Sequence, residues 1–148
     1  MGGAVHTPAG AGAPNDAFGL PRRFHVTGDA TLPSVWEEDV PEGAGPPRHI
    51  HTSAAELFVV RTGRVLFEAD GAQFEAGAGD TVLIPMGVPH AFKGLAPDGS
   101  VVLITLSPGG GDAFFRAVSD EGLSPATDMP RITELAELYD VAFVGPPL

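Results

Sequence analysis

The chain of 148 residues contains no cysteine. A disulfide framework, a thiolate metal site and a cysteine nucleophile are therefore excluded. Any metal ion that the protein binds must have nitrogen and oxygen ligands, which leaves histidine and carboxylate side chains as the candidates.

Basic residues are also scarce. Eight lysines and arginines stand against nineteen aspartates and glutamates, and the formal net charge is -11. A protein that neutralises phosphates needs clustered lysine and arginine, so nucleic acid is not an expected partner. An anionic membrane surface is disfavoured for the same reason.

Long apolar runs are missing as well. No stretch approaches the roughly 18 consecutive apolar residues of a membrane helix, and the first residues lack the basic start and apolar run of a signal peptide. We therefore expect no membrane association and a cytoplasmic location.

What the sequence does contain is enough apolar residues, 43%, to fill one core. Twenty glycines and fifteen prolines punctuate short β-prone segments, as in folds with many turns. Many short strands at close spacing predict an all-β sandwich or barrel. The predicted strands are 24–27, 34–39, 49–51, 56–62, 64–68, 73–76, 81–84, 90–93 and 101–106.

The pattern divides the chain into three parts. Residues 1–19, rich in glycine, alanine and proline, are expected to form a flexible tail. Residues 20–108 are expected to form the barrel, and Asp70-Gly71 within them predicts a tight hairpin. Residues 109–148 are expected to form a helical extension that packs on the barrel, with Asp112 as a helix cap.

Four residues form a candidate metal site: His49, His51, Glu56 and His90. Alternate side chains of a strand share a face, so the two imidazoles at 49 and 51 point the same way. Glu56 follows after a short turn, and His90 follows a Gly/Pro turn. A single His-x-His pair is commonly incidental, but the four together predict a site.

Three imidazoles and one carboxylate suit one divalent transition metal: Fe, Ni, Mn, Cu or Zn. With five or six ligands, the ion keeps positions open for water or substrate, as catalytic sites do. We expect the substrate pocket to be lined by Phe58, Val60, Ile84 and Phe92.

The spacing of two motifs resembles the cupin family. The first motif is Gly43, five residues, His49-x-His51, four residues, Glu56, six residues and Gly63; the second is Gly79, five residues, Pro85-x-Gly87, two residues and His90. The resemblance covers roughly residues 24–106 and implies a double-stranded β-helix, or jelly-roll barrel, with a metal on the four residues above. Gly94 stands where the second motif usually ends in asparagine, which is not a metal ligand in the family pattern.

The C-terminal segment, with Pro108-Gly109-Gly110 and Phe114-Phe115-Arg116, is similar to single-domain cupins described as quercetin-dioxygenase-like. The first functional hypothesis is therefore a dioxygenase that acts on a flavonol-like or aromatic polyketide substrate, with Glu56 as both ligand and proton acceptor. The alternatives are a non-redox metal-dependent cyclase, isomerase or lyase, and a non-catalytic module that binds a small molecule. The resemblance also implies a homodimer.

Overall fold

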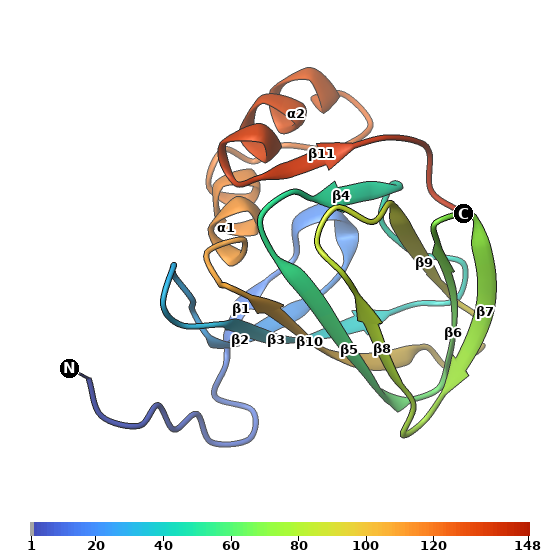
Figure 1. Ribbon diagram of the computed structural model, residues 1–148, viewed down its shortest axis with the longest axis horizontal. Coiled ribbons are helices and arrows are strands. Elements are labelled where there is room, and N and C mark those ends of the chain that lie inside the picture. Colours follow the sequence, from blue (N-terminus) through green and yellow to red (C-terminus); the bar gives the residue numbers. More distant parts are fainter. Residues whose placement is uncertain (1) are drawn as a thin grey trace.

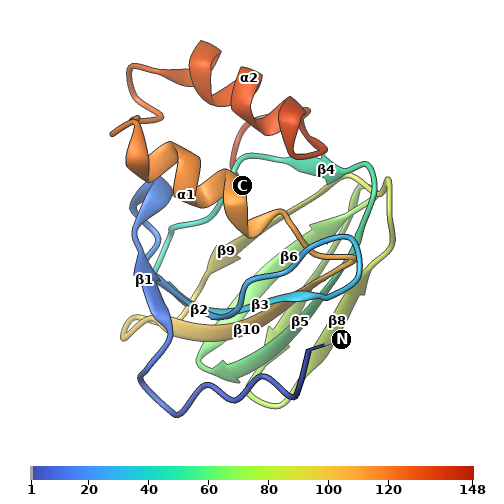
Figure 2. The ribbon, with the colours of Figure 1, turned by 90° about the vertical axis from the view of Figure 1, so that its left-hand side faces the viewer.

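Residues 2–148 are described by a computed structural model, which contains two antiparallel sheets facing each other (Figure 1, Figure 2). In sheet order, the first comprises β1 (Ala13–Asn15), β2 (Arg22–Val26), β3 (Ser34–Val40), β10 (Ser100–Ser107), β5 (Ala55–Thr62) and β8 (Thr81–Ile84). The second comprises β11 (Val141–Phe143), β4 (His49–His51), β9 (His90–Gly94), β6 (Arg64–Ala69) and β7 (Ala72–Gly77). The predicted jelly-roll barrel is confirmed.

The core lies between the sheets because the strands alternate apolar and polar positions. On β5, Phe58 and Val60 are fully buried, whereas Leu57 and Val59 on the opposite face are half-buried. Burial of an apolar side chain of this size contributes about 1.5–3 kcal/mol. The period-two pattern therefore determines which face of the sheet points inward.

The hairpin between β6 and β7 turns at Asp70 and Gly71, as the sequence predicts. Both residues have positive φ angles, 50° and 80°, which is the conformation of a type I′ turn. The turn sets the register in which Ala69 pairs with Ala72 and Arg64 pairs with Gly77.

Two short helices, α1 (Asp112–Asp120) and α2 (Met129–Leu138), follow the last long strand. They pack together around a second apolar cluster that includes Phe114, Val118 and Ile132. In both views the helices lie at the end of the barrel where β4 runs (Figure 1, Figure 2), and β11 lies next to β4 (Figure 1). Among residues 2–148, no helix is long and apolar enough to cross a membrane.

Two expectations differ from the structure. Residues 13–19 are not a free tail, because β1 pairs with β2 and Ala17 is buried in the helical cluster. Tertiary contacts order this segment, and its composition does not reveal them. Asp112 does not cap α1 either; it is fully buried, and its carboxylate accepts hydrogen bonds from Ser34 Oγ and from the backbone N–H of Gly28.

Candidate metal centre

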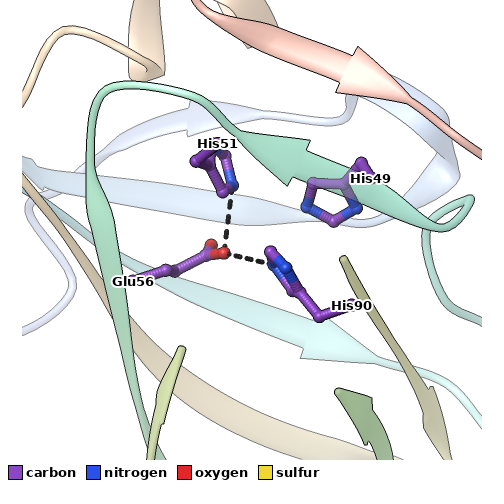
Figure 3. Close-up of side chains that lie close together, drawn as sticks. All are labelled: His49, His51, Glu56 and His90. Atoms are coloured by element: carbon purple, nitrogen blue, oxygen red, sulfur yellow. Dashed lines mark hydrogen bonds and ion pairs between the residues drawn. The ribbon is translucent and has the colours of Figure 1, made fainter. Parts of the chain in front are cut away.

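The four predicted ligands converge between the two sheets (Figure 3). His49 and His51 project from β4 and His90 from β9, where His90 pairs with His49. Glu56 reaches the same point from β5 in the opposite sheet. One ligand atom from each residue lies within 4.8 Å of the others. Residues separated along the chain thus meet because the barrel closes around them.

Backbone carbonyls fix the orientation of two imidazoles. His49 Nδ1 donates to the carbonyl oxygen of Pro47 at 2.8 Å, and His90 Nδ1 donates to that of Val88 at 2.9 Å. Because a carbonyl oxygen can only accept, Nδ1 carries a proton in each ring, and Nε2 is the nitrogen that can bind a metal ion when it carries no proton. Metal-binding histidines are commonly held in this way.

The Nε2 atoms of two imidazoles lie close to a carboxylate. His90 Nε2 lies 2.9 Å from Glu56 Oε2, and His51 Nε2 lies 3.0 Å from the same oxygen. Among the described residues, His51 Nε2 is the buried side-chain polar atom without a hydrogen-bond partner. Nitrogen and oxygen atoms that converge in this way can share a cation, either a proton or a metal ion, and a buried polar atom without a partner, such as His51 Nε2, is costly.

A divalent transition metal fits this donor set. Three imidazole nitrogens and one carboxylate oxygen suit Fe, Ni, Mn, Cu or Zn, and ligand distances of about 2.1 Å are usual for nitrogen and oxygen on zinc. Two ligands of one such ion lie at most about 4.2 Å apart. A small inward movement of the side chains would therefore complete the site.

The buried environment shifts the pKa values of three of these groups. Burial, followed by the neighbouring His90 and His51, lowers the pKa of His49 to about 3. Burial by itself raises the pKa of Glu56, but the charge and hydrogen bonds of His51 and His90 outweigh it and hold this pKa below its usual range. Burial lowers the pKa of His90, but the hydrogen bond to Glu56 and its charge outweigh burial and raise it. In the metal-free protein, His90 thus takes up a proton more readily than His49.

An apolar pocket of about 600 Å³, part of it open to solvent, leads to this cluster. Most of its wall consists of aromatic and aliphatic side chains: Phe18, Leu20, Trp36, Phe92, Ile104, Leu106, Phe114, Phe115, Val141 and Phe143. His49, His51 and Glu56 line the same pocket. The arrangement can hold a flat, apolar molecule with one end at the metal centre.

Of the four predicted pocket residues, Phe92 lies in the pocket wall. The other three, Phe58, Val60 and Ile84, do not line it; they are buried in the barrel core, and each is at most 2% exposed. The pocket instead extends toward η1 (Ala17–Gly19), α1 and β11, which close this end of the barrel. The sequence thus predicted a pocket inside the barrel core, whereas the observed pocket lies at the end of the barrel that these elements close.

Sequence reasoning also missed several wall residues. Phe18 and Phe115 were assigned to segments outside the barrel, and Arg22 precedes the first strand that the sequence predicts. Glu38 could have been found, because it shares a strand face with Trp36 by the period of two. The aromatic contacts that bring Phe18 to Phe114 and Phe115 join residues almost a hundred positions apart.

Comparison with known proteins gives one family match. The model of a cupin domain, Cupin_2, matches residues 36–109. An uncharacterized protein of Methanocaldococcus jannaschii is 34% identical over 62 residues, which are 42% of this chain and 50% of that protein. The chain therefore spans about half the length of this curated relative.

Solved structures share the fold. An RmlC-like cupin from Shewanella frigidimarina has a TM-score of 0.63 and 23% identity, over 74% of this chain and 96% of that one. KdgF from Halomonas sp. has a TM-score of 0.58 and 23% identity, over 64% and 85% of the two chains. A Cupin 2 conserved barrel domain protein from Salinispora arenicola has a TM-score of 0.58 and 19% identity, over 71% and 89%. At these identities the similarity concerns the fold alone.

Proposed function

This chain belongs to the Cupin_2 family of cupin domains, and from that premise we propose that it is a metal-dependent enzyme acting on a hydrophobic, oxygen-bearing small molecule. His49, His51, Glu56 and His90 would hold one divalent transition metal. The observation that carries the proposal is the convergence of three imidazoles and the Glu56 carboxylate beside an apolar pocket.

A bound divalent ion supplies Lewis-acid chemistry, which lowers the pKa of a hydroxyl group that reaches it. Glu56 supplies the proton acceptor. Its Oε2 faces His51 and His90, while its Oε1 makes no hydrogen bond to any described residue. Because Glu56 lines the pocket, this free oxygen can take the proton of a phenol or enol.

We propose that the reaction is a dioxygenation of a flavonol-like or aromatic polyketide substrate. A dioxygenase places both atoms of dioxygen in its products and oxidises the substrate itself, so the site needs no external reductant. The aromatic wall formed by residues such as Trp36, Phe92 and Phe115 supports this class of substrate, since flat rings pack well on aromatic side chains. The similarity of the C-terminal segment to quercetin-dioxygenase-like cupins is the further support.

The second candidate is a non-redox cyclase, isomerase or lyase. The free Glu56 Oε1 at the pocket favours it, because proton transfer to a carboxylate requires no oxidant. Both candidates predict that enzyme activity depends on the metal, and they differ in their need for dioxygen.

Metal content and oxygen dependence test the proposal together. Protein purified without added metal is analysed for its elements, stripped with a chelator, reloaded with each candidate ion and assayed with 3-hydroxyflavone in air and under strict anaerobiosis. Iron, nickel or copper with oxygen-dependent turnover supports a dioxygenase. Zinc with turnover that survives anaerobiosis supports the second candidate.

The His49→Asn variant should lose the metal. His25→Asn is the matched control, since His25 lies on the first sheet near Glu37 and away from the cluster. Equal metal content in both variants, or turnover unaffected by metal removal, would overturn the proposal.

A further inference from the structure

A buried ion pair lies in the wall of the pocket, apart from the metal ligands. Arg22 and Glu38 are 2% and 3% exposed, and Arg22 Nε donates to Glu38 Oε2 at 3.0 Å. Both residues line the pocket, whose wall is otherwise almost entirely apolar outside the metal centre. Charged side chains are seldom buried without a specific use, because their desolvation is costly.

Protein contacts use only part of the hydrogen-bonding capacity of the pair. Arg22 Nη1 donates to Asn15 Oδ1 at 2.8 Å and to the carbonyl oxygen of Ala17 at 3.0 Å. Glu38 Oε2 also accepts from Trp36 Nε1 at 3.2 Å. Arg22 Nη2 and Glu38 Oε1 make no hydrogen bond to any residue in the range 2–148.

Both of these atoms keep a small exposed surface. Within the described part of the chain, His51 Nε2 is the one fully buried side-chain polar atom that lacks a hydrogen-bond partner. Nη2 of Arg22 and Oε1 of Glu38 must therefore keep some exposed surface. Since both residues lie in the pocket wall, that surface is available to a ligand.

The pair lies at the opposite end of the pocket from the metal centre. Glu56 on β5 pairs with Leu106 on β10, and Leu106 pairs in turn with Ser34 on β3. Glu38 lies four residues further along β3. Four residues of strand span about 13 Å, and two strand spacings add about 10 Å across the sheet. A ligand with two or three rings can bridge such a span once the side chains reach inward.

An aromatic surface connects the two ends. The Arg22 guanidinium lies over the Phe115 ring, 4.0 Å from its centroid, and Phe115 contacts Trp36 with ring centroids 5.7 Å apart. Stacking of this kind holds the guanidinium plane in place. The pocket thus has an apolar, largely aromatic wall between two polar groups, the candidate metal ligands and the Arg22–Glu38 pair.

We propose that Arg22 and Glu38 form a second recognition point, which binds a neutral hydroxyl group on the end of an aromatic ligand remote from the metal. This inference rests on the proposed function, since it extends the substrate class of the same pocket. The pair has no net charge, so it suits a group that both accepts and donates. Nη2 donates to the hydroxyl oxygen, and the hydroxyl hydrogen is donated to Oε1.

A carboxylate at that end would be repelled by Glu38, and an ammonium group by Arg22. The recognition point therefore selects a hydroxyl over either charged group.

The test compares four fluorescent probes: 3-hydroxyflavone and its derivatives with one added hydroxyl at position 6, 7 or 4′. At least one derivative should bind the wild-type protein tenfold or more tightly than the parent probe does. In the double variant Arg22→Met with Glu38→Met this preference should disappear while the parent still binds. Buried ion pairs are often replaceable by apolar residues of similar volume, so this variant is expected to fold.

A second variant tests the charge balance without removing either side chain. Glu38→Gln leaves the charge of Arg22 uncompensated. A further probe, which carries a carboxylate in place of the preferred hydroxyl, should therefore gain at least tenfold in affinity relative to the hydroxyl probe. Glu37→Gln is the matched control, because Glu37 lies on the outer face of β3 with Arg23 and Arg61. Binding by the control should equal that of the wild type.

The inference is overturned if no derivative exceeds the parent tenfold in the wild type, if the preference survives in the double variant, or if Glu38→Gln leaves the hydroxyl-to-carboxylate ratio unchanged. The same titrations in chelator-treated protein separate it from the proposed function. Arg22 and Glu38 do not belong to the metal cluster, so the hydroxyl preference should remain there while all probes bind more weakly. A protein that binds no metal but keeps this preference would contradict the proposed function alone.

Discussion

At the scale of single residues, the proposed function gives Glu56 two roles, one for each of its oxygens. Oε2 faces the imidazoles of His51 and His90, Oε1 makes no hydrogen bond to any described residue, and Glu56 lines the pocket. We expect Glu56→Gln to reduce kcat by about 10²-fold to 10⁴-fold, since an amide cannot take the proton of the substrate. Steady-state kinetics, with metal content measured on the same sample, provide the readout.

Glu56→Asp is the control for charge, because it keeps a carboxylate in a shorter side chain. Partial activity in Glu56→Asp with little in Glu56→Gln would identify proton transfer as the function of this residue. If Glu56→Gln turns over at the wild-type rate, Glu56 is not the proton acceptor.

The shifted pKa values predict how metal binding depends on pH. The pKa of His90 is raised above the ordinary 6.5, so at lower pH the metal-free protein carries a proton there. His49, with a pKa of about 3, remains neutral. A metal must displace the proton on His90, so affinity should fall about tenfold for each pH unit as the pH falls from about 6.5 to about 5.

Calorimetric titration of the metal in buffers of different ionisation enthalpy counts the protons that are released. We expect His90 to contribute about one released proton per metal ion near pH 6. Release of three protons would show that all three imidazoles are protonated in the metal-free state, and release of none would show that His90 is not.

At the scale of elements, the C-terminal part supports the strand that carries two ligands. β11 pairs with β4, and α2 packs against the cluster that includes Val141. Ile132 of α2 is fully buried there. We expect Ile132→Ala to lower the free energy of unfolding by about 2–5 kcal/mol, because it leaves a cavity. Urea unfolding followed by circular dichroism measures the change.

Leu138→Ala on the same helix is the matched control, since Leu138 is 73% exposed and its loss should cost about 0.5 kcal/mol or less. A similar loss in both variants would mean that α2 does not stabilise the fold through its buried face.

The elements also show which features the sequence could predict. The Asp70-Gly71 turn and the alternation along β5 follow from local chemistry, and the predicted strands resemble the observed ones for that reason. The convergence of His49 with Glu56 depends on motif spacing, which also lies in the sequence. β1 and the buried Asp112 depend on partners far along the chain, and no local pattern encodes them.

At the scale of the whole molecule, the residues that line the pocket come from two regions, the matched cupin region and the segments on either side of it. The four candidate metal ligands lie within the matched cupin region, residues 36–109. Much of the wall comes from the flanks: Phe18, Leu20, Arg22, Phe114, Phe115, Val141 and Phe143. The flanks are thus placed to determine which ligand fits, and this is why the pocket could not be predicted from the cupin motifs.

The outer face of the first sheet bears on the predicted homodimer. Leu57 pairs with Leu83 on one side and with Thr105 on the other, and Val59 pairs with Leu103. The apolar side chains on this face are half-buried or exposed: Val35, Leu57, Val59, Leu83, Val101 and Leu103. A contiguous apolar face of this kind is typical of an interaction surface, and we propose that a second copy of the chain covers it.

The proposed dimer should respond to both charge and salt. Each chain carries a formal net charge of -11, so repulsion between two copies should weaken the dimer at low ionic strength, and added salt should strengthen it by screening. Leu83→Asp should produce a monomer, because it places a charge in the proposed interface, where Leu83 is the most exposed apolar side chain. Leu138→Asp makes the same change on α2 and should leave the dimer intact. Size-exclusion chromatography with light scattering distinguishes the masses, and a wild-type protein that is monomeric at every salt concentration would contradict the interface.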